Sequence, residues 1–137
     1  MYDGSSADGL NIEIYTNGNP RLYYKVGGVG YSYLFTTDIR SEALTHIAIT
    51  IDGMAARLYV NGEFAEEAAL TVAAPDTFDF NVGNDKRPLG GQYFKGSIYS
   101  VALFEDVRTA EEIKLDSIFV TNTSSGLLYS AYYTEKH

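Results

Sequence analysis

Short segments in which apolar and polar residues alternate recur along the chain, separated by turn residues. The clearest is a hairpin with arms at residues 47–51 and 57–60, where isoleucine, leucine or valine occupies every second position. Alternation with a period of two predicts strands that bury one face. Asp52-Gly53 separates the arms, and Asn61-Gly62 ends the second arm with residues that tolerate the positive φ of a tight turn.

The same pattern predicts further strands on both sides of this hairpin. They cover residues 10–14, 22–26, 31–36, 64–65, 70–73, 78–82, 93–104, 118–120 and 127–133. The stretch 93–104 is the longest and ends in an almost wholly apolar run, so we expect it to be a central strand. Alanines at 68, 69, 73 and 74 have low strand preference, and a helical turn is the alternative there.

One helix is expected in the C-terminal third. Thr109 and Glu112 have the spacing of a capping box, in which each side chain satisfies the backbone N–H of the other residue, and Ile113 begins an apolar face. The helix should therefore begin near Ala110. Many short strands with a single short helix predict an all-β fold, a sandwich of two sheets.

Composition narrows the classes of partner. The 137 residues are 45% hydrophobic, which fits one domain spanning 1–137 with a real core. Eighteen acidic residues against ten Lys and Arg give a net charge of -8, which opposes nucleic acids and anionic membrane surfaces. No apolar run is long enough to span a bilayer. Cysteine is absent, which excludes disulfides and thiolate metal sites.

Five segments in order give the chain a resemblance to a known family. HIAITIDG, RLYVNG, NVG, FKGSIYSVALF and RTAEEI follow one another as in laminin-G-like domains of the concanavalin A-like lectin and glucanase superfamily. The resemblance implies a jelly-roll sandwich of two antiparallel sheets. The abrupt start of the chain predicts a domain excised from a larger protein, and the lack of cysteine is compatible with a bacterial secreted module, so we expect an extracellular or cell-surface location.

The chain departs from that family's pattern in three places. Leu44 stands where the family usually has a core tryptophan. Tyr99 and Ser100 stand where it usually has two acidic residues, so no role of those acids transfers to this chain. The polar loop that often holds calcium has no match before Leu10.

Catalysis is not expected. Glycoside hydrolysis needs two carboxyl groups that face each other about 5–10 Å apart, whereas the acidic residues here occur mainly as adjacent pairs, which a strand would point to opposite faces. His46 would be the base of any nucleophile triad, but it lies at the start of a core strand, where a buried structural role is the simpler interpretation. The sequence therefore predicts a domain that is not an enzyme.

Calcium is the one metal that the residue types suit, because it prefers oxygen ligands. Asp79 and Asp85 are the candidate ligands, together with Asn81 and Asn84 near the same strand end. The alternative is that these residues are the solvent-facing side of a strand followed by turn residues.

Carbohydrate binding is the function that the sequence favours. The irregular stretch 84–93 offers hydrogen-bonding groups and an aromatic ring in the residues Asn84, Asp85, Arg87, Gln92 and Tyr93. Arg87 is the leading candidate because its planar fork can grip a carboxylate, so acidic sugars are the first glycans to test. Tyr31, Tyr33 and Tyr99 are the next candidates, although each of them also fits simple packing between sheets.

The alternative function is a protein-interaction or structural spacer domain without a small ligand. Neighbouring domains of a larger chain are partners in either case. A broad, flat apolar surface would favour the alternative, and an open groove lined with polar and aromatic side chains would favour sugar binding.

Overall fold

The computed structural model describes residues 9–41, 43–75, 94–99, 101–122 and 131–136. Within these ranges the chain forms strands and a helix in the order β1 (Gly9–Ile14), β2 (Pro20–Val26), β3 (Val29–Leu34), β4 (Ile47–Asp52), β5 (Ala55–Val60), β6 (Glu63–Ala69), β7 (Val101–Phe104), α1 (Ala110–Asn122) and β8 (Ala131–Lys136).

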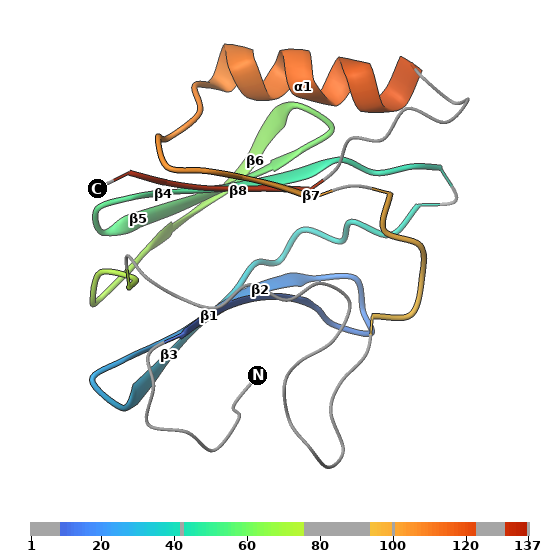
Figure 1. The fold of residues 1–137 in the computed structure, drawn as a ribbon. Coiled ribbons are helices and arrows are strands. Elements are labelled where there is room, and N and C mark those ends of the chain that lie inside the picture. Colours follow the sequence, from blue (N-terminus) through green and yellow to red (C-terminus); the bar gives the residue numbers. More distant parts are fainter. Residues whose placement is uncertain (1–8, 42, 76–93, 100, 123–130, 137) are drawn as a thin grey trace.

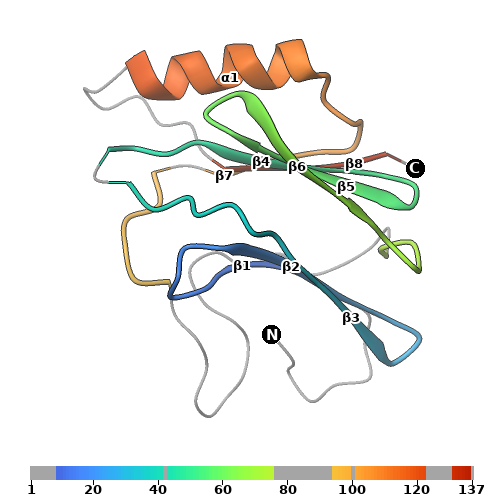
Figure 2. The same ribbon diagram turned by 180° about the vertical axis from the view of Figure 1, so that it is seen from behind.

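The strands form two layers (Figure 1). One sheet has the order β1-β2-β3, and the other has the order β6-β5-β4-β8-β7. Helix α1 lies on the side of the larger sheet that faces away from the smaller one, as both views show (Figures 1 and 2). The predicted mostly-β sandwich with a single helix is therefore confirmed for the described residues.

The hairpin that anchors the sequence pattern forms as expected. Strands β4 and β5 pair antiparallel with Ile49 opposite Leu58. Gly53, in the turn between them, has a φ of 59°. Asn61 and Gly62 then turn the chain into β6 with φ values of 50° and 82°. The left-handed conformation is one that Asn and Gly adopt at low cost, which is why these residues end the strands.

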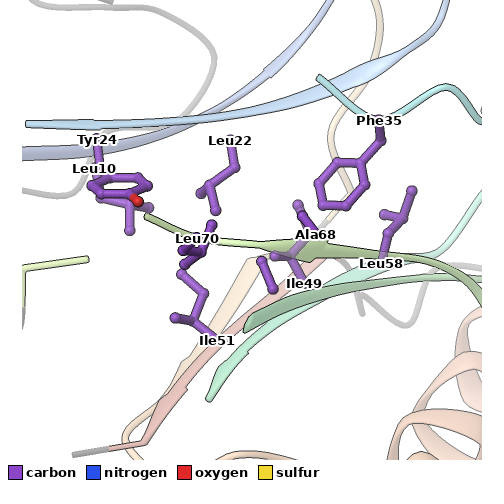
Figure 3. Close-up of a cluster of buried hydrophobic side chains, with 10 residues drawn as sticks. Leu10, Leu22, Tyr24, Phe35, Ile49, Ile51, Leu58, Ala68 and Leu70 are labelled. Atoms are coloured by element: carbon purple, nitrogen blue, oxygen red, sulfur yellow. The ribbon is translucent and has the colours of Figure 1, made fainter. Parts of the chain in front are cut away.

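The core fills the space between the sheets (Figure 3). Leu22 and Tyr24 of β2 face Ile49, Ile51 and Leu58 of the larger sheet, and all five are almost fully buried. Each aliphatic side chain buried in this way contributes about 1.5–3 kcal/mol of hydrophobic stabilisation. The core thus accounts for the alternation that defines β2, β4 and β5 in the sequence.

A second, smaller cluster attaches α1 to the outer face of the larger sheet. Ile113 is fully buried there against Ala48 and Tyr59. At the start of the helix, the Glu112 N–H donates to the Thr109 hydroxyl at 3.2 Å, and the Thr109 N–H donates to the Glu112 carboxylate at 2.8 Å. The predicted capping box is therefore confirmed.

Arg108 connects the N-terminal end of α1 to β7. Its guanidinium lies 4.5 Å above the ring of Phe104 and pairs with Asp116 at 3.0 Å and with Glu112 at 3.2 Å. These contacts join the strand, the connection and the first two turns of the helix.

Strand β8 departs from the expected antiparallel pattern. It pairs parallel with both β4 and β7. Parallel neighbours need a crossover connection, and α1 supplies it, so that β7, α1 and β8 form a strand–helix–strand unit. This unit is the one part of the described sheets that is not antiparallel.

Three strand predictions were wrong in detail. In the predicted strand 93–104, the described residues 94–99 lie outside any strand, and Val101–Phe104 form β7, which lies at the edge of its sheet because β8 takes the inner position. Residues 118–120 belong to α1, since a helix already begun by a capping box continues through residues of higher strand preference. Residues 70–73 form no strand, and the alanines at 68 and 69 belong to β6 rather than to a helical turn.

Leu44 also differs from expectation. It is 37% exposed and lies outside the core, so the position where the resembling family has tryptophan is a surface position here.

Candidate functional site

The residues of the predicted sugar and calcium sites fall outside the described ranges. They are Asp79, Asn81, Asn84, Asp85, Arg87, Gln92 and Tyr93. Their assignment to a glycan or to calcium stays a prediction. Within the part of the chain that the structure describes, no group of three His, Asp or Glu side chains has the geometry to hold a metal ion.

The three alternative tyrosines do not share a surface. Tyr31 stacks on Tyr24 with ring centroids 5.4 Å apart, and Tyr33 meets Phe35 edge-on at 5.1 Å. Both pack against the main core. Tyr99 lies outside any strand and is 58% exposed. Tyr31 and Tyr33 therefore pack between the sheets, which is the alternative to ligand binding that the sequence allowed for them.

A different group of polar and aromatic side chains gathers on the outer face of the smaller sheet. Because Leu22 and Tyr24 point into the core, their neighbours Arg21 and Tyr23 point outward. Glu13 of β1 is directly opposite Arg21 in the ladder. Tyr15, which follows β1, completes the group. We call Glu13, Tyr15, Arg21 and Tyr23 the Arg21 cluster.

Arg21 is the centre of this cluster. Its guanidinium carbon lies 5.5 Å from the centroid of the Tyr15 ring and 4.9 Å from that of the Tyr23 ring. Its Nη1 donates to the Tyr15 hydroxyl. Its Nε lies 3.4 Å from the Glu13 carboxylate, an ion pair without hydrogen-bond geometry. A cation between two rings is stabilised by both of their negative faces.

Gly30 of β3 makes room for one of these rings. A Cβ at Gly30 would lie 2.5 Å from the Tyr23 hydroxyl oxygen and 3.1 Å from the ring carbon that bears it. The hydroxyl end of the Tyr23 ring therefore occupies the space that a side chain at position 30 would fill. Ser32 and Leu34, the outward residues farther along β3, are exposed.

The two ends of this sheet face differ in access. Lys25, next outward on β2, is only 5% exposed. The Tyr15 end is more open, with Tyr15 itself 37% exposed and Leu34, which pairs with Arg21, 41% exposed.

The alternation of side chains along a strand predicts most of this cluster from the sequence. Once residues 20–26 are a strand with Leu22 and Tyr24 inside, Arg21, Tyr23 and Lys25 must share the opposite face. Tyr15 joins them through the turn after β1, which strand alternation does not predict.

His46 is buried, as expected. No part of its surface is exposed, and burial lowers the pKa of its imidazole to about 4, against the opposing effect of the Asp116 carboxylate. Its backbone N–H donates to the Asn61 side chain at 2.9 Å, and its carbonyl accepts from the Asn61 N–H at 2.8 Å. The Ser117 hydroxyl of α1 donates to the Lys114 carbonyl at 2.7 Å. These contacts fit a structural role for His46.

Among the described residues, α1 is too short and too polar to be a membrane-crossing helix.

Comparison with known proteins gives one family and one structure. A family model described as the concanavalin A-like lectin/glucanases superfamily (Laminin_G_3) matches residues 1–114. The match ends within α1, before β8. No curated protein matches the chain.

A solved structure similar to this chain is the 2.1 Å crystal structure of an S-layer domain-containing protein (residues 221–444) from Clostridium thermocellum ATCC 27405. The two chains superpose with a TM-score of 0.51 at 21% sequence identity. The match covers 83% of this chain and 58% of that one. This likeness concerns the fold.

Proposed function

The chain belongs to the concanavalin A-like lectin/glucanases superfamily, and we propose that it is a non-catalytic carbohydrate-binding module of a larger secreted or cell-surface protein. A superfamily with both lectins and glucanases leaves binding and hydrolysis to be separated by the residues themselves.

The observation that carries the proposal is the outer face of the smaller sheet. Helix α1 covers the outer face of the larger sheet, and the core fills the space between the two sheets. Among the described residues, the outer face of the smaller sheet carries Tyr15 and Tyr23 with Arg21 between them. Sugars stack their apolar faces on aromatic rings and are oriented by polar groups beside them, so this composition suits a glycan.

The described acidic residues support binding rather than hydrolysis. Several are committed to cations or backbone groups: Glu13 pairs with Arg21, Glu63 with Lys114, Glu67 with Arg57, and Glu112 with Thr109 and Arg108. Glu66 accepts hydrogen bonds from Thr36 and Thr37. None of these contacts presents two carboxyl groups to a shared substrate space, which hydrolysis requires.

The proposed location is extracellular or on the cell surface of a bacterium. The family includes lectins, and the structural neighbour is a bacterial S-layer domain-containing protein. Both accord with a role outside the cytoplasm.

A protein-interaction domain is the second candidate, and one observation favours it. Leu115 and Ile118 lie on the outward side of α1 with 61% and 44% of their surface exposed. Apolar side chains three positions apart on a helix are neighbours and offer a small docking surface.

A glycan array on the domain tests the proposal, with Arg87→Ala and Tyr93→Ala as variants. We expect glycan hits for the parent protein, and a loss of affinity in both variants would support the predicted site at 84–93. A folded domain that binds no glycan would contradict carbohydrate binding. Hits that survive both substitutions with unchanged affinity would contradict the predicted site at 84–93 and leave the function standing. Release of reducing ends from any polysaccharide would contradict the non-catalytic assignment.

A further inference from the structure

We propose that the Arg21 cluster binds the carboxylate of a single acidic sugar residue, a uronic or a sialic acid at a glycan terminus. This inference rests on the proposed carbohydrate binding; it gives the acidic sugar a site at Arg21, apart from the predicted residues 84–93, and narrows the ligand to a single terminal residue.

The first argument is that Arg21 is already held in place. Tyr15, Tyr23 and Glu13 contact its guanidinium from three positions, two of them on strands and one in the following turn. A flexible arginine loses rotamer freedom when it grips a ligand, whereas one fixed beforehand loses little. The guanidinium is also charged at every ordinary pH, so it attracts a carboxylate throughout the range of a binding experiment.

The second argument concerns the donors that remain. Nη1 is committed to the Tyr15 hydroxyl, and Nε faces Glu13. Nη2 donates to no residue within the described ranges. The Tyr15 hydroxyl, which accepts from Nη1, still has its own hydrogen to donate. Two kinds of donor, the Nη2 hydrogens and the Tyr15 O–H, are therefore side by side.

The third argument is that Glu13 balances the charge of Arg21 but accepts no hydrogen bond from its Nε. Their 3.4 Å separation is longer than the roughly 2.7–2.9 Å of a charge-assisted hydrogen bond, and the angle at Nε does not form one. A carboxylate that reaches Nη2 in good geometry gains an interaction that Glu13 does not make.

Apolar surface beside these donors suits the rest of the sugar. Tyr15 is partly exposed, and Leu34, opposite Arg21 in the ladder, is exposed. The C–H face of a pyranose can lie on such surface while its carboxylate meets the arginine.

The net charge of the protein favours ligands with a single negative charge over polyanions. The net charge of -8 repels polyanions such as uronic acid polymers, and the repulsion grows with every charge on the chain. A ligand with one carboxylate loses little to this repulsion. We therefore expect a terminal acidic sugar to be preferred over a polyuronate.

Matched pairs of sugars test the inference. Two pairs differ in a carboxylate on the same sugar: glucuronic acid with glucose, and galacturonic acid with galactose. A third pair, sialyllactose with lactose, differs in the sialic acid residue that carries the carboxylate. Titration of the parent protein at pH 7 should give at least tenfold tighter binding of the acidic member. Arg21→Gln should abolish this preference, and Tyr15→Phe should reduce it several-fold.

Arg57→Gln is the matched control, because Arg57 also pairs with a glutamate, Glu67, on the outer face of a sheet, but on the larger one. It should leave the preference unchanged. Melting curves for each variant report whether it folds. If Arg21→Gln does not fold, the Tyr15→Phe result and ligand-induced shifts of the Arg21 side-chain NMR signal in the parent protein decide the question.

The outcomes separate the inference from the function beneath it. Equal binding of acidic and neutral sugars, or a preference that survives Arg21→Gln, overturns the inference while carbohydrate binding stands. An absence of binding to every glycan on an array overturns both.

Discussion

Glu66 of β6 accepts a backbone hydrogen bond from Thr36, at 2.9 Å, and so joins the larger sheet to the segment that leaves the smaller one. The Thr37 N–H and both threonine hydroxyls donate to the same carboxylate, at 2.9–3.1 Å. One side chain thus satisfies two backbone donors at the point where the chain passes between layers.

Replacing Glu66 with Ala should lower the free energy of unfolding by about 1–3 kcal/mol, because the bonds to Thr36 and Thr37 are lost. Glu66→Gln should cost less, since the amide keeps an acceptor. Urea denaturation measures both. Equal stability of the parent protein and the alanine variant would show that water replaces the carboxylate without loss.

The stability supplied by Glu66 should depend on pH. Burial alone raises the pKa of Glu66, but the hydrogen bonds from Thr36 and Thr37 outweigh it and hold the pKa below its usual value of 4.5. The contribution is therefore complete above that value and is lost as the pH falls through the lower pKa of the folded state. The difference in stability between the parent protein and Glu66→Gln should shrink in acid.

On acidification, His46 should begin to lower the stability of the fold at a higher pH than Glu66 does. The unfolded chain binds a proton at this residue near pH 6.5, whereas burial lowers the pKa in the fold to about 4. Between these values the unfolded state binds more protons, so stability falls as the pH falls, by up to about 3 kcal/mol in all. A flat profile from pH 7 to 5, or an unchanged slope in His46→Gln, would contradict this.

Gly62 and Gly53 form a matched pair for measuring the contact with α1. Both have positive φ, 82° and 59°, but a Cβ at Gly62 would meet the Ser117 hydroxyl and lie 3.0 Å from the Lys114 Cα, whereas a Cβ at Gly53 would meet nothing within 4 Å. Gly53→Ala should cost about 1–2 kcal/mol from backbone strain. Gly62→Ala should cost about 1–3 kcal/mol more, because the helix must move. Equal losses of stability in Gly53→Ala and Gly62→Ala would contradict this, because they would mean that α1 can move away from position 62 at no cost.

Calcium remains a prediction for the residues around Asp79 and Asp85. If it binds there, excess calcium should raise the Tm of metal-stripped protein by mass action, since a site of this kind exists only in the folded state. Asp85→Asn should abolish the increase, and Asp38→Asn, at an aspartate paired with Arg40, should not. No increase in the parent protein would exclude the site.

The sequence predicted what local patterns determine. The capping box at Thr109 fixed the start of α1 to the residue, and the turn at Asn61-Gly62 has the positive φ values that those residues suggest. Strands β1 to β5 lie close to their expected positions because turn or polar residues separate them, and apolar residues at alternate positions mark a core face in β1, β4 and β5.

What the sequence did not predict depends on partners far away in the chain. The apolar run before Phe104 looked central, but its place is decided by β8, which enters between β7 and β4. The Arg21 cluster likewise depends on Tyr15 reaching a guanidinium six positions later through a turn. Neither pairing leaves a trace in local composition.

The inner place of β8 has a consequence for how the protein is made. Strands β4, β5 and β6 follow one another through short turns and can pair as soon as they leave the ribosome. The free edge of β4, however, waits for a strand that is synthesised after β7 and α1. During that interval the nascent chain presents an unpaired apolar edge, the kind of surface on which strands of other molecules assemble. Slow parallel pairing of β8 should therefore limit the folding rate, and the yield of folded protein should depend on how quickly that last strand closes the sheet.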